Sequence, residues 1–287
     1  MLEKSGFSDV VCRELQIDAP KPNLEEWKQM VERIRNRSEE VHIGLVGKYV
    51  KLHDAYLSVA EAMEHAGYEL NTFVKINWID SENITKENVN DILKGLDGII
   101  IPGGFGNRGV EGMILSAKYA RENQIPYFGI CLGMQIAVIE FARNVLKIAD
   151  AHSGEFDEQC AHKVINFMPG QSERRDKGGT LRLGSYPCSI KAGTKIEKCY
   201  GDKLIHERHR HRYEFNNEYR EPLMRAGLVI SGTSPDNRLV ETIELKEHPF
   251  FVGVQFHPEF KSRPNQSHPL FKEFILMSFK ESKRKER

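Results

Sequence analysis

The sequence lacks an excess of charge of either sign, because its 287 residues include 41 Lys and Arg against 41 Asp and Glu. Proteins that hold nucleic acid through bulk positive charge need such an excess, so we expect no nucleic-acid partner. No apolar run reaches the roughly 20 residues of a membrane span. The nearest approach, residues 125–142, contains Pro126, Gln135 and Glu140. We therefore expect no membrane partner.

Paired cysteine motifs and a secretory leader are absent as well. The five cysteines are widely spaced and include no C-x-x-C, a pattern typical of reduced thiols in the cytosol. The first residues are acidic and polar, where a signal peptide would carry a basic segment and then an apolar one. The sequence therefore favours a cytoplasmic location.

From residue 41 onward, the sequence contains a regular alternation of short apolar runs and amphipathic segments. This alternation predicts βαβ units around a parallel sheet. We expect strands over residues 41–47, 98–101 and 127–130, and helices over residues 54–65, 86–93, 109–122, 133–146 and 270–279. Gly67 is the expected end of the first helix. Beyond residue 150 the runs, including one over residues 209–216, indicate strands of mixed direction.

The predicted fold is therefore α/β, with a mainly parallel central sheet flanked by helices and additional mixed or antiparallel strands in the C-terminal half. Residues 1–40 do not share the alternation: after a loose polar opening, Asn23 and Glu26 provide a capping-box signature for one amphipathic helix. We expect residues 1–40 to be an interdomain linker segment and residues 41–287 to form one domain. The charged stretch 169–180 is an expected exposed loop, and the tail after residue 279 an expected solvated end.

The stretch Gly129-Ile-Cys131-Leu-Gly133, between a predicted strand and a predicted helix, has the form of a nucleophile elbow. Its glycines permit a strained turn that exposes the nucleophile and aims the next backbone N–H group at a developing oxyanion. Cys131 is the candidate nucleophile. The alternative is an ordinary buried cysteine, the common fate of a thiol in an apolar run.

His257 and Glu259 follow another predicted strand, in the motif His-Pro-Glu. His257 is a candidate general base, and Glu259 could orient its ring as the acid does in Cys–His–acid triads. Because parallel strands present their carboxyl ends at one edge of a sheet, we expect this motif, the elbow and the glycine-rich residues 102–106 to meet there.

Residues 104–109 also satisfy G-x-G-x-x-G, a pattern that favours dinucleotide binding. That fingerprint expects an acidic residue about 20 positions later, but the next strand ends at Cys131 instead. We therefore interpret the loop as the source of a second oxyanion donor, the backbone N–H group of Gly104.

Two further stretches resemble ligand-binding motifs but do not match them. In residues 44–49 the glycines are too close together for a P-loop, and Tyr49 replaces the hydroxyl residue that would hold magnesium. The histidines of residues 206–212 match no zinc spacing, and the interleaved arginines oppose a cation. We expect no metal site, and we expect an arginine of this stretch to bind a carboxylate.

The stretches PGGFG, GICLGMQ and QFHPEF together resemble the triad-type, or class I, glutamine amidotransferases. VGKY, RGVEG, EFARNVL, GGTLRLG and ERHRHRYEFN narrow the resemblance to the branch whose glutaminase domain follows a synthetase domain. The similarity runs from about residue 41 to the C-terminal helix, and it implies the fold of that family.

The resemblance implies that glutamine is hydrolysed to glutamate and ammonia through a γ-glutamyl thioester on Cys131, with His257 and Glu259 completing the triad. It implies that Gly104 and Leu132 supply the oxyanion N–H groups. The implied glutamine-binding residues are Gly104, Leu132, Gly133, Met134, Gln135, Glu155 and Arg212. The candidate residues for a GTP effector are Phe105, Arg108 and Glu111.

The resemblance also implies partners outside this chain. In that branch the ammonia aminates UTP to CTP, with ATP and Mg on an N-terminal synthetase domain and GTP as an allosteric activator, and the complete enzyme is a homotetramer. Nothing in this sequence resembles the synthetase domain. We therefore expect one catalytic part of a longer enzyme, with no cofactor of its own.

Two alternatives stay open. A stand-alone Cys–His–Glu hydrolase, such as a γ-glutamyl peptidase, would not need Gln135, Glu155 and Arg212, which suit a free amino acid. A non-catalytic regulatory module on the same fold would not need an intact triad.

Overall fold

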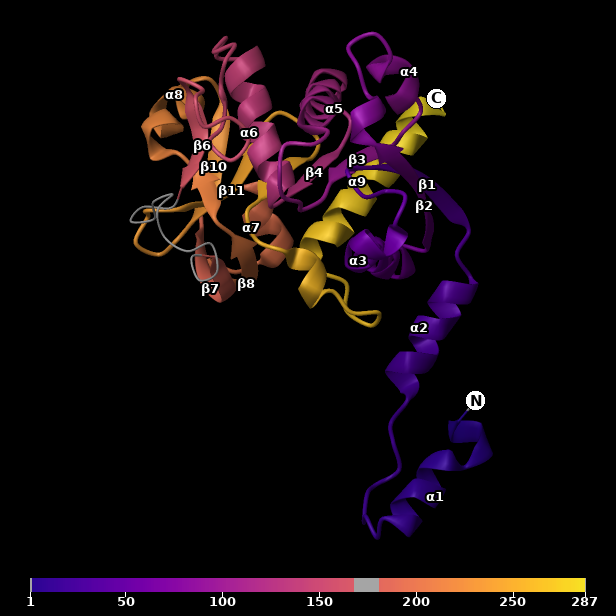
Figure 1. The fold of residues 1–287 in the computed structure, drawn as a ribbon. Helices are drawn as coiled ribbons and strands as arrows, with labels where there is room; N and C mark the ends of the chain where they lie inside the picture. Colours follow the sequence, from indigo (N-terminus) through magenta and orange to yellow (C-terminus); the bar gives the residue numbers. More distant parts are fainter. Residues whose placement is uncertain (1, 168–180, 287) are drawn as a thin grey trace.

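A nine-stranded mixed sheet is the centre of the computed structural model, which describes residues 2–167 and 181–286 (Figure 1). Its strands are β1 (Glu39–Gly47), β2 (Thr72–Asp80), β3 (Gly98–Ile101), β4 (Tyr127–Ile130), β7 (Arg182–Ile190), β8 (Leu204–His211), β10 (Leu228–Thr233), β11 (Val240–Leu245) and β12 (Phe251–Val254). Their order is β2-β1-β3-β4-β12-β11-β10-β7-β8. Neighbours are parallel from β2 to β12 and antiparallel from β12 to β8. The predicted α/β class, with a parallel sheet followed by antiparallel strands, is confirmed.

A second, three-stranded sheet consists of β5 (His152–Ser153), β6 (Lys163–Phe167) and β9 (Tyr213–Phe215), in the order β5-β6-β9. The prediction of a single strand over residues 209–216 is wrong. The chain leaves the large sheet after His211 and joins the small sheet at Tyr213. Arg212 therefore lies at the junction between the two sheets.

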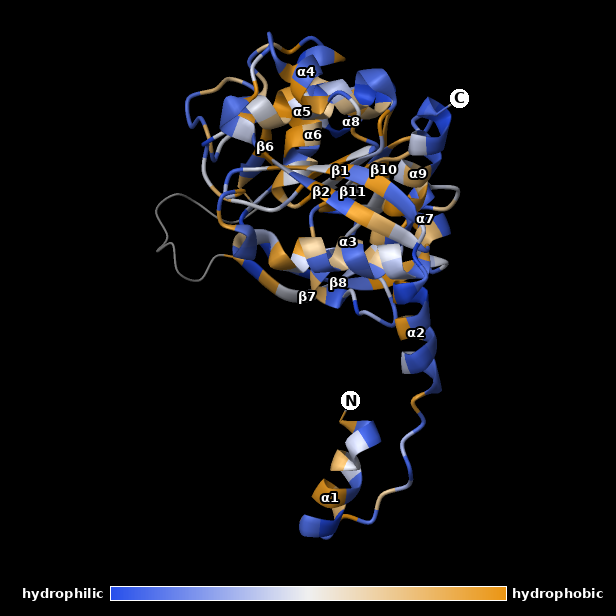
Figure 2. Ribbon diagram, turned by 90° about the vertical axis from the view of Figure 1, so that its right-hand side faces the viewer, coloured by the Kyte–Doolittle hydropathy of each residue, from blue (hydrophilic) through white to orange (hydrophobic). Residues whose placement is uncertain are grey.

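Helices cover both faces of the large sheet. The helices are α1 (Phe7–Glu14), α2 (Glu25–Arg35), α3 (Leu57–Glu69), α4 (Val89–Leu93), α5 (Val110–Asn123), α6 (Leu132–Asn144), α7 (Lys195–Tyr200), α8 (Arg220–Arg225) and α9 (Pro269–Lys285), with short 3-10 turns η1 (Glu3–Ser5), η2 (His53–Tyr56), η3 (Ser81–Asn83), η4 (Asn217–Tyr219) and η5 (Pro258–Lys261). Helices α4, α5 and α6 pack on one face, and α3, α7 and α9 on the other (Figure 2). No helix in the described part of the chain is long and apolar enough to cross a membrane.

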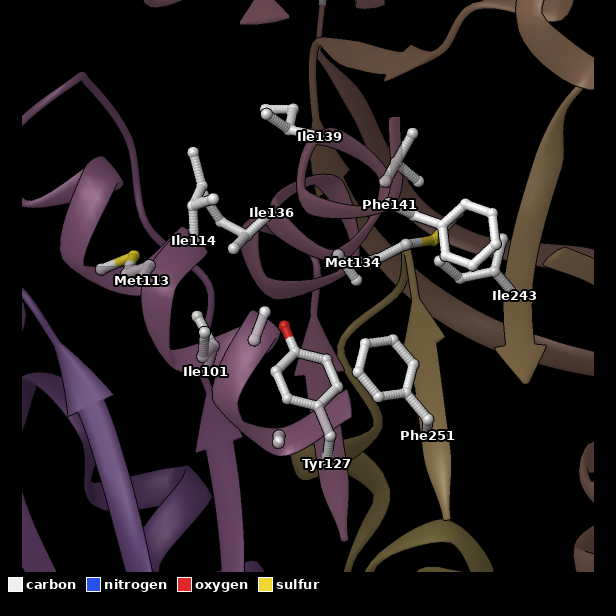
Figure 3. Close-up of a cluster of buried hydrophobic side chains, with 14 of the residues drawn as sticks. Ile101, Met113, Ile114, Tyr127, Met134, Ile136, Ile139, Phe141, Ile243 and Phe251 are labelled. Atoms are coloured by element: carbon white, nitrogen blue, oxygen red, sulfur yellow. The ribbon is translucent and has the colours of Figure 1, made fainter. Parts of the chain in front are cut away.

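The short central strands are buried on both faces, as their unbroken apolar sequences predict. In β3, Ile99 and Ile101 contribute to the core under α5 and α6, whereas Ile100 contributes to the core under α3 and α9. Figure 3 shows the first of these cores, in which the rings of Tyr127 and Phe251 stack with centroids 4.5 Å apart. Burying one such side chain contributes about 1.5–3 kcal/mol, so both cores hold these strands, and the loops at their ends, in place.

Two predicted helix ends are wrong. Helix α3 continues through Gly67 to Glu69. The glycine serves packing and not helix termination, because the carbonyl oxygen of Thr72 lies 2.6 Å from where a Cβ would be. Helix α9 extends to Lys285, whose Nζ lies 3.2 Å from Asp97 Oδ1, so the expected solvated tail is part of a docked helix. The expected loop at residues 169–180 lies outside the described residues.

The N-terminal segment also differs from its prediction. The expected loose opening contains α1, none of whose residues is buried, and α1 lies apart from the sheet (Figure 1). The expected capping box does not form: Asn23 Oδ1 accepts from the backbone N–H of Glu25, and Glu26 accepts instead from Asn265. Met30 is the one buried residue of α2. The assignment of residues 1–40 as an interdomain linker stays a prediction.

Candidate active site

Cys131 lies at the sharp turn between β4 and α6, with φ 51° and ψ −96°. Positive φ is strained for a residue with a Cβ, and such strain gathers at functional sites. The glycines of the motif are required by close contacts. A Cβ on Gly133 would collide with the carbonyl oxygen of Ile101, and one on Gly129 would lie 2.6 Å from the Gly133 carbonyl carbon. The Tyr127 hydroxyl donates to the Gly133 carbonyl at 2.7 Å, and this hydrogen bond helps to hold the turn in place.

His257 and Glu259 stand beside this cysteine. His257 Nδ1 lies 2.7 Å from Glu259 Oε1, and all three residues line one cavity of about 280 Å³. Burial lowers the pKa of His257, but the interactions with Cys131 and with Glu259 outweigh burial and raise that pKa to about 10. The imidazole therefore carries a proton at neutral pH, and a neighbouring positive charge favours the thiolate form of a cysteine.

The two candidate oxyanion donors lie next to each other. Leu132 is the first residue of α6, so its N–H group has no carbonyl partner within the helix. Gly104 follows β3, and a Cβ there would lie 3.2 Å from Leu132 Cδ2. Leu132 follows Cys131 in the sequence, and Gly104 lines the same cavity as Cys131. Their role as oxyanion donors stays a prediction.

A second cavity of about 250 Å³ opens from Cys131 toward the predicted glutamine-binding residues, and Gly104, Gln135, Glu155 and Arg212 all line it. Burial raises the pKa of Glu155, while the Gly106 N–H group, Lys48 and Arg212 oppose that shift. Glu155 and Arg212 thus bring one negative and one positive side chain to the same small cavity, as the two charges of a free amino acid require.

Three predicted substrate residues, Leu132, Gly133 and Met134, do not line this cavity. Gly133 packs against the carbonyl oxygen of Ile101, and Met134 points into the hydrophobic core toward Phe141 and Ile243 (Figure 3). None of the three is among the described residues that line the cavity. Their part in glutamine binding, if limited to the backbone, stays a prediction.

Gln255 is a residue of the site that sequence reasoning missed. Its Nε2 donates to Cys131 Sγ at 3.6 Å, and its Oε1 accepts from Gln135 Nε2 at 3.3 Å. Gln135 Nε2 also donates to the Tyr213 carbonyl at 3.0 Å. A chain of amides therefore joins the nucleophile to the substrate cavity. The available signal was its place two residues before His257, at the end of β12.

The three GTP candidates are dispersed. Phe105 is half exposed beside both cavities. Arg108 pairs with Glu82 at 2.8 Å, and Glu111 pairs with Arg143 at 2.9 Å. The structure brings Phe105 and Arg108 to one loop but turns the Glu111 carboxylate toward α6.

The histidine-rich strand β8 alternates between exposed and buried side chains. His209 and His211 point inward with Nδ1 and Nε2 2.9 Å apart, while His206 lies on the exposed face. Burial lowers the pKa of His211 to about 3 and that of His209 further, so both rings are neutral. No group of metal-ligating side chains converges anywhere in the described residues.

Several known proteins are similar to this chain in sequence and in fold. A family model described as Glutamine amidotransferase class-I matches residues 51–277. Curated relatives named CTP synthase include one from Carboxydothermus hydrogenoformans, 60% identical over 282 residues, and one from Listeria innocua, 57% identical over 274 residues. The matches cover 98% and 96% of this chain but 53% and 52% of the relatives. The chain thus spans about half the length of the curated relatives it matches.

A solved structure, the Trypanosoma brucei CTPS glutaminase domain with bound acivicin, is 41% identical with a TM-score of 0.79. The match covers 84% of this chain and 94% of that one. The chain therefore belongs to the class I glutamine amidotransferases, in the branch formed by the glutaminase domains of CTP synthases.

Proposed function

We propose that this chain hydrolyses L-glutamine to glutamate and ammonia through a γ-glutamyl thioester on Cys131. The observation that carries the proposal is the meeting of a strained elbow cysteine, the His257–Glu259 pair at 2.7 Å and a cavity with both Glu155 and Arg212. A non-catalytic module would have no reason to hold a cysteine at positive φ beside a charged imidazole.

In the first step, the Cys131 thiolate attacks the carboxamide carbon of glutamine, and the carbonyl oxygen takes the negative charge. The N–H groups of Gly104 and Leu132 would stabilise that oxyanion, and one such donor is typically worth about 10²–10³ in rate. The protonated His257 then gives its proton to the leaving nitrogen. Ammonia departs, and the γ-glutamyl group stays on sulfur as a thioester.

In the second step, water attacks the thioester. His257, now neutral, takes a proton from that water, while Glu259 keeps the ring oriented and stabilises the imidazolium that forms. The C–S bond breaks, glutamate leaves, and the thiolate–imidazolium pair is restored.

The two cavities suit substrate and product. Glutamine would lie in the cavity with Glu155 and Arg212, its α-ammonium facing the first and its α-carboxylate the second. The other cavity also adjoins Cys131 and is lined by Tyr49, Pro102 and Phe260. We propose that ammonia leaves on that side.

The complete enzyme would use this ammonia to aminate UTP to CTP. Since the chain spans about half of its CTP synthase relatives, ATP, UTP and Mg would bind a synthetase domain outside it, and GTP would activate glutamine hydrolysis. Phe105 is the best placed GTP candidate because it is half exposed, whereas Arg108 and Glu111 would first have to leave Glu82 and Arg143. A homotetrameric assembly and a cytoplasmic location belong to the same proposal.

The test is covalent labelling with a chloromethyl ketone analogue of glutamine, whose chloride the thiolate displaces to form a thioether. Mass spectrometry should find one label per chain, on Cys131, with L-glutamine protecting. Cys131→Ser should take none. The matched control is Cys188→Ser. Cys188 is a second buried cysteine, burial raises its thiol pKa, and its loss should leave labelling unchanged. Label on another cysteine, or label persisting in Cys131→Ser, would contradict the proposal.

A further inference from the structure

Lys48 is a buried cation that no part of the proposed reaction uses. It belongs to the stretch of residues 44–49, which does not match a P-loop, and it follows β1 directly. Its relative exposure is 3%, and its Nζ donates to the Phe105 carbonyl at 3.0 Å and to the Gly106 carbonyl. Burying a charge is costly unless strong partners compensate, so a lysine placed here has a specific task.

The backbone of Lys48 is tied to the same region. Its N–H group donates to the Tyr56 hydroxyl at 3.1 Å, and its carbonyl accepts from Arg108 Nη2 at 2.8 Å. Lys48 Cε also lies 3.9 Å from where a Cβ on Gly104 would be. Lys48 therefore contacts the loop at Phe105, Gly106 and Arg108 and lies close to Gly104.

The contact with Phe105 also reaches the substrate side. The Phe105 carbonyl and the Gly106 N–H group belong to one trans peptide, so they point in opposite directions. Lys48 Nζ holds the carbonyl end, and Glu155 Oε1 accepts from the N–H end at 2.8 Å. By orienting this peptide, Lys48 also directs the Gly106 N–H group toward the Glu155 carboxylate.

We propose that Lys48 is a positioning residue for glutamine hydrolysis, which sets both the Gly104 N–H group that meets the oxyanion and the Glu155 carboxylate that meets the α-ammonium. This inference rests on the proposed function. Lys48 acts through the loop, because it is not among the described residues that line either cavity at Cys131.

The charge of Lys48 gives a separate readout. Burial lowers its pKa to about 8, with Glu155 opposing and Arg108 adding to the shift. The Phe156 ring lies 5.6 Å from Nζ, and the Tyr56 hydroxyl meets the backbone N–H group of the same lysine. As pH rises through about 8, the amine loses its proton and the clamp on the two carbonyls weakens. An arginine at this position keeps its proton throughout that range.

The experiment compares Lys48→Met and Lys48→Arg with the matched control Lys195→Met. Lys195 also donates to two backbone carbonyls, those of Leu245 and Lys246, but far from the site. The chloroketone should label Lys48→Met about 10–100-fold more slowly than the parent chain, with a weaker apparent affinity as well. This loss is smaller than the roughly 10²–10³ typical of a removed oxyanion donor, because the Gly104 N–H group is displaced and not deleted. Lys48→Arg should recover most of the rate and lose the decline near pH 8. Lys195→Met should match the parent chain.

Iodoacetamide separates positioning from general damage, because it needs neither the oxyanion donors nor Glu155. Its rate of reaction with Cys131 should change less than about threefold in Lys48→Met. If iodoacetamide and the chloroketone slow equally, or if Lys48→Met labels at the parent rate, the inference about Lys48 is wrong. If the parent chain is not labelled at Cys131 at all, the proposed function fails, a different result from either of these.

Discussion

In the parallel half of the large sheet, β3, β4 and β12 are four residues long, apolar and buried on both faces. The chemistry lies just beyond their carboxyl ends, in Gly104, Cys131 and His257. In the antiparallel half, β8 alternates between buried and exposed residues, and three of the four side chains it buries, Glu207, His209 and His211, are charged or polar. Both halves border the same site, but they hold their functional residues by different means.

The parallel half relies on backbone fit. Gly133 meets the carbonyl oxygen of Ile101, and Gly103 meets the ring of His257, so neither position has room for a side chain. The antiparallel half relies on charge pairing. Arg182 Nη1 lies 2.6 Å from Glu241 Oε1, and His209 and His211 fill the space beside them. Substitutions in the parallel half should therefore lower the rate, and those in the antiparallel half should chiefly lower stability.

The largest effect is expected at His257. In His257→Asn no group can give a proton to the leaving nitrogen, and glutamate formation at saturating glutamine should fall by about 10⁴-fold or more. The control is His248→Asn, which removes another buried histidine, one that bonds to the Ala120 carbonyl away from the site. It should lower stability while leaving the turnover of the folded fraction within about threefold. Equal losses of turnover in both variants would show that the loss at His257 reflects general damage and not the missing proton donor.

Sequence reasoning succeeded where function depends on local backbone. The strands over residues 98–101 and 127–130 were predicted with their observed bounds, because an apolar run between glycine or proline residues has few alternatives. The elbow at Cys131 was predicted from the spacing of two glycines, and the structure shows the close contacts that require them.

It failed where a residue acts through partners distant in the chain. Lys48 meets Phe105 and Gly106 across more than fifty positions, and Gln255 meets Cys131 across 124. The division of residues 209–216 between two sheets depends on β6 and β7, which flank the chain in space. No periodicity within one segment records such pairings, because they are settled by the packing of the whole sheet.

The next largest effect is expected at the Arg182–Glu241 pair, where the loss of stability should depend on which partner is replaced. Glu241→Gln leaves a buried guanidinium that cannot lose its proton, so the free energy of unfolding should fall by about 3 kcal/mol or more. Arg182→Met leaves a carboxyl that burial already brings to a pKa of about 7, so it can become neutral instead. That variant should lose clearly less stability in urea unfolding at pH 7. The double variant should regain much of the loss. Equal losses in the two single variants would show that packing, and not charge, decides stability there.

The smallest effect is expected at Glu214, which is 3% exposed and close to His211. Burial raises its pKa from 4.5 to about 8, with Glu241 adding to the shift and Arg182 opposing it. Between these values the folded state holds a proton that the unfolded chain has released, so this group makes stability fall as pH rises. The slope is at most about 1.4 kcal/mol per pH unit, and it ends above the folded pKa.

Glu214→Gln cannot titrate, so between pH 6.5 and 8.5 its melting temperature should rise relative to that of the parent chain, by about 2–4 °C for each kcal/mol. The histidines, including His257 with its raised pKa, are present in both proteins, so any slope they add cancels in this difference. Parallel melting curves for the two proteins across this range would mean that Glu214 is already ionised in the fold, and that the antiparallel half tolerates more unpaired charge than its burial suggests.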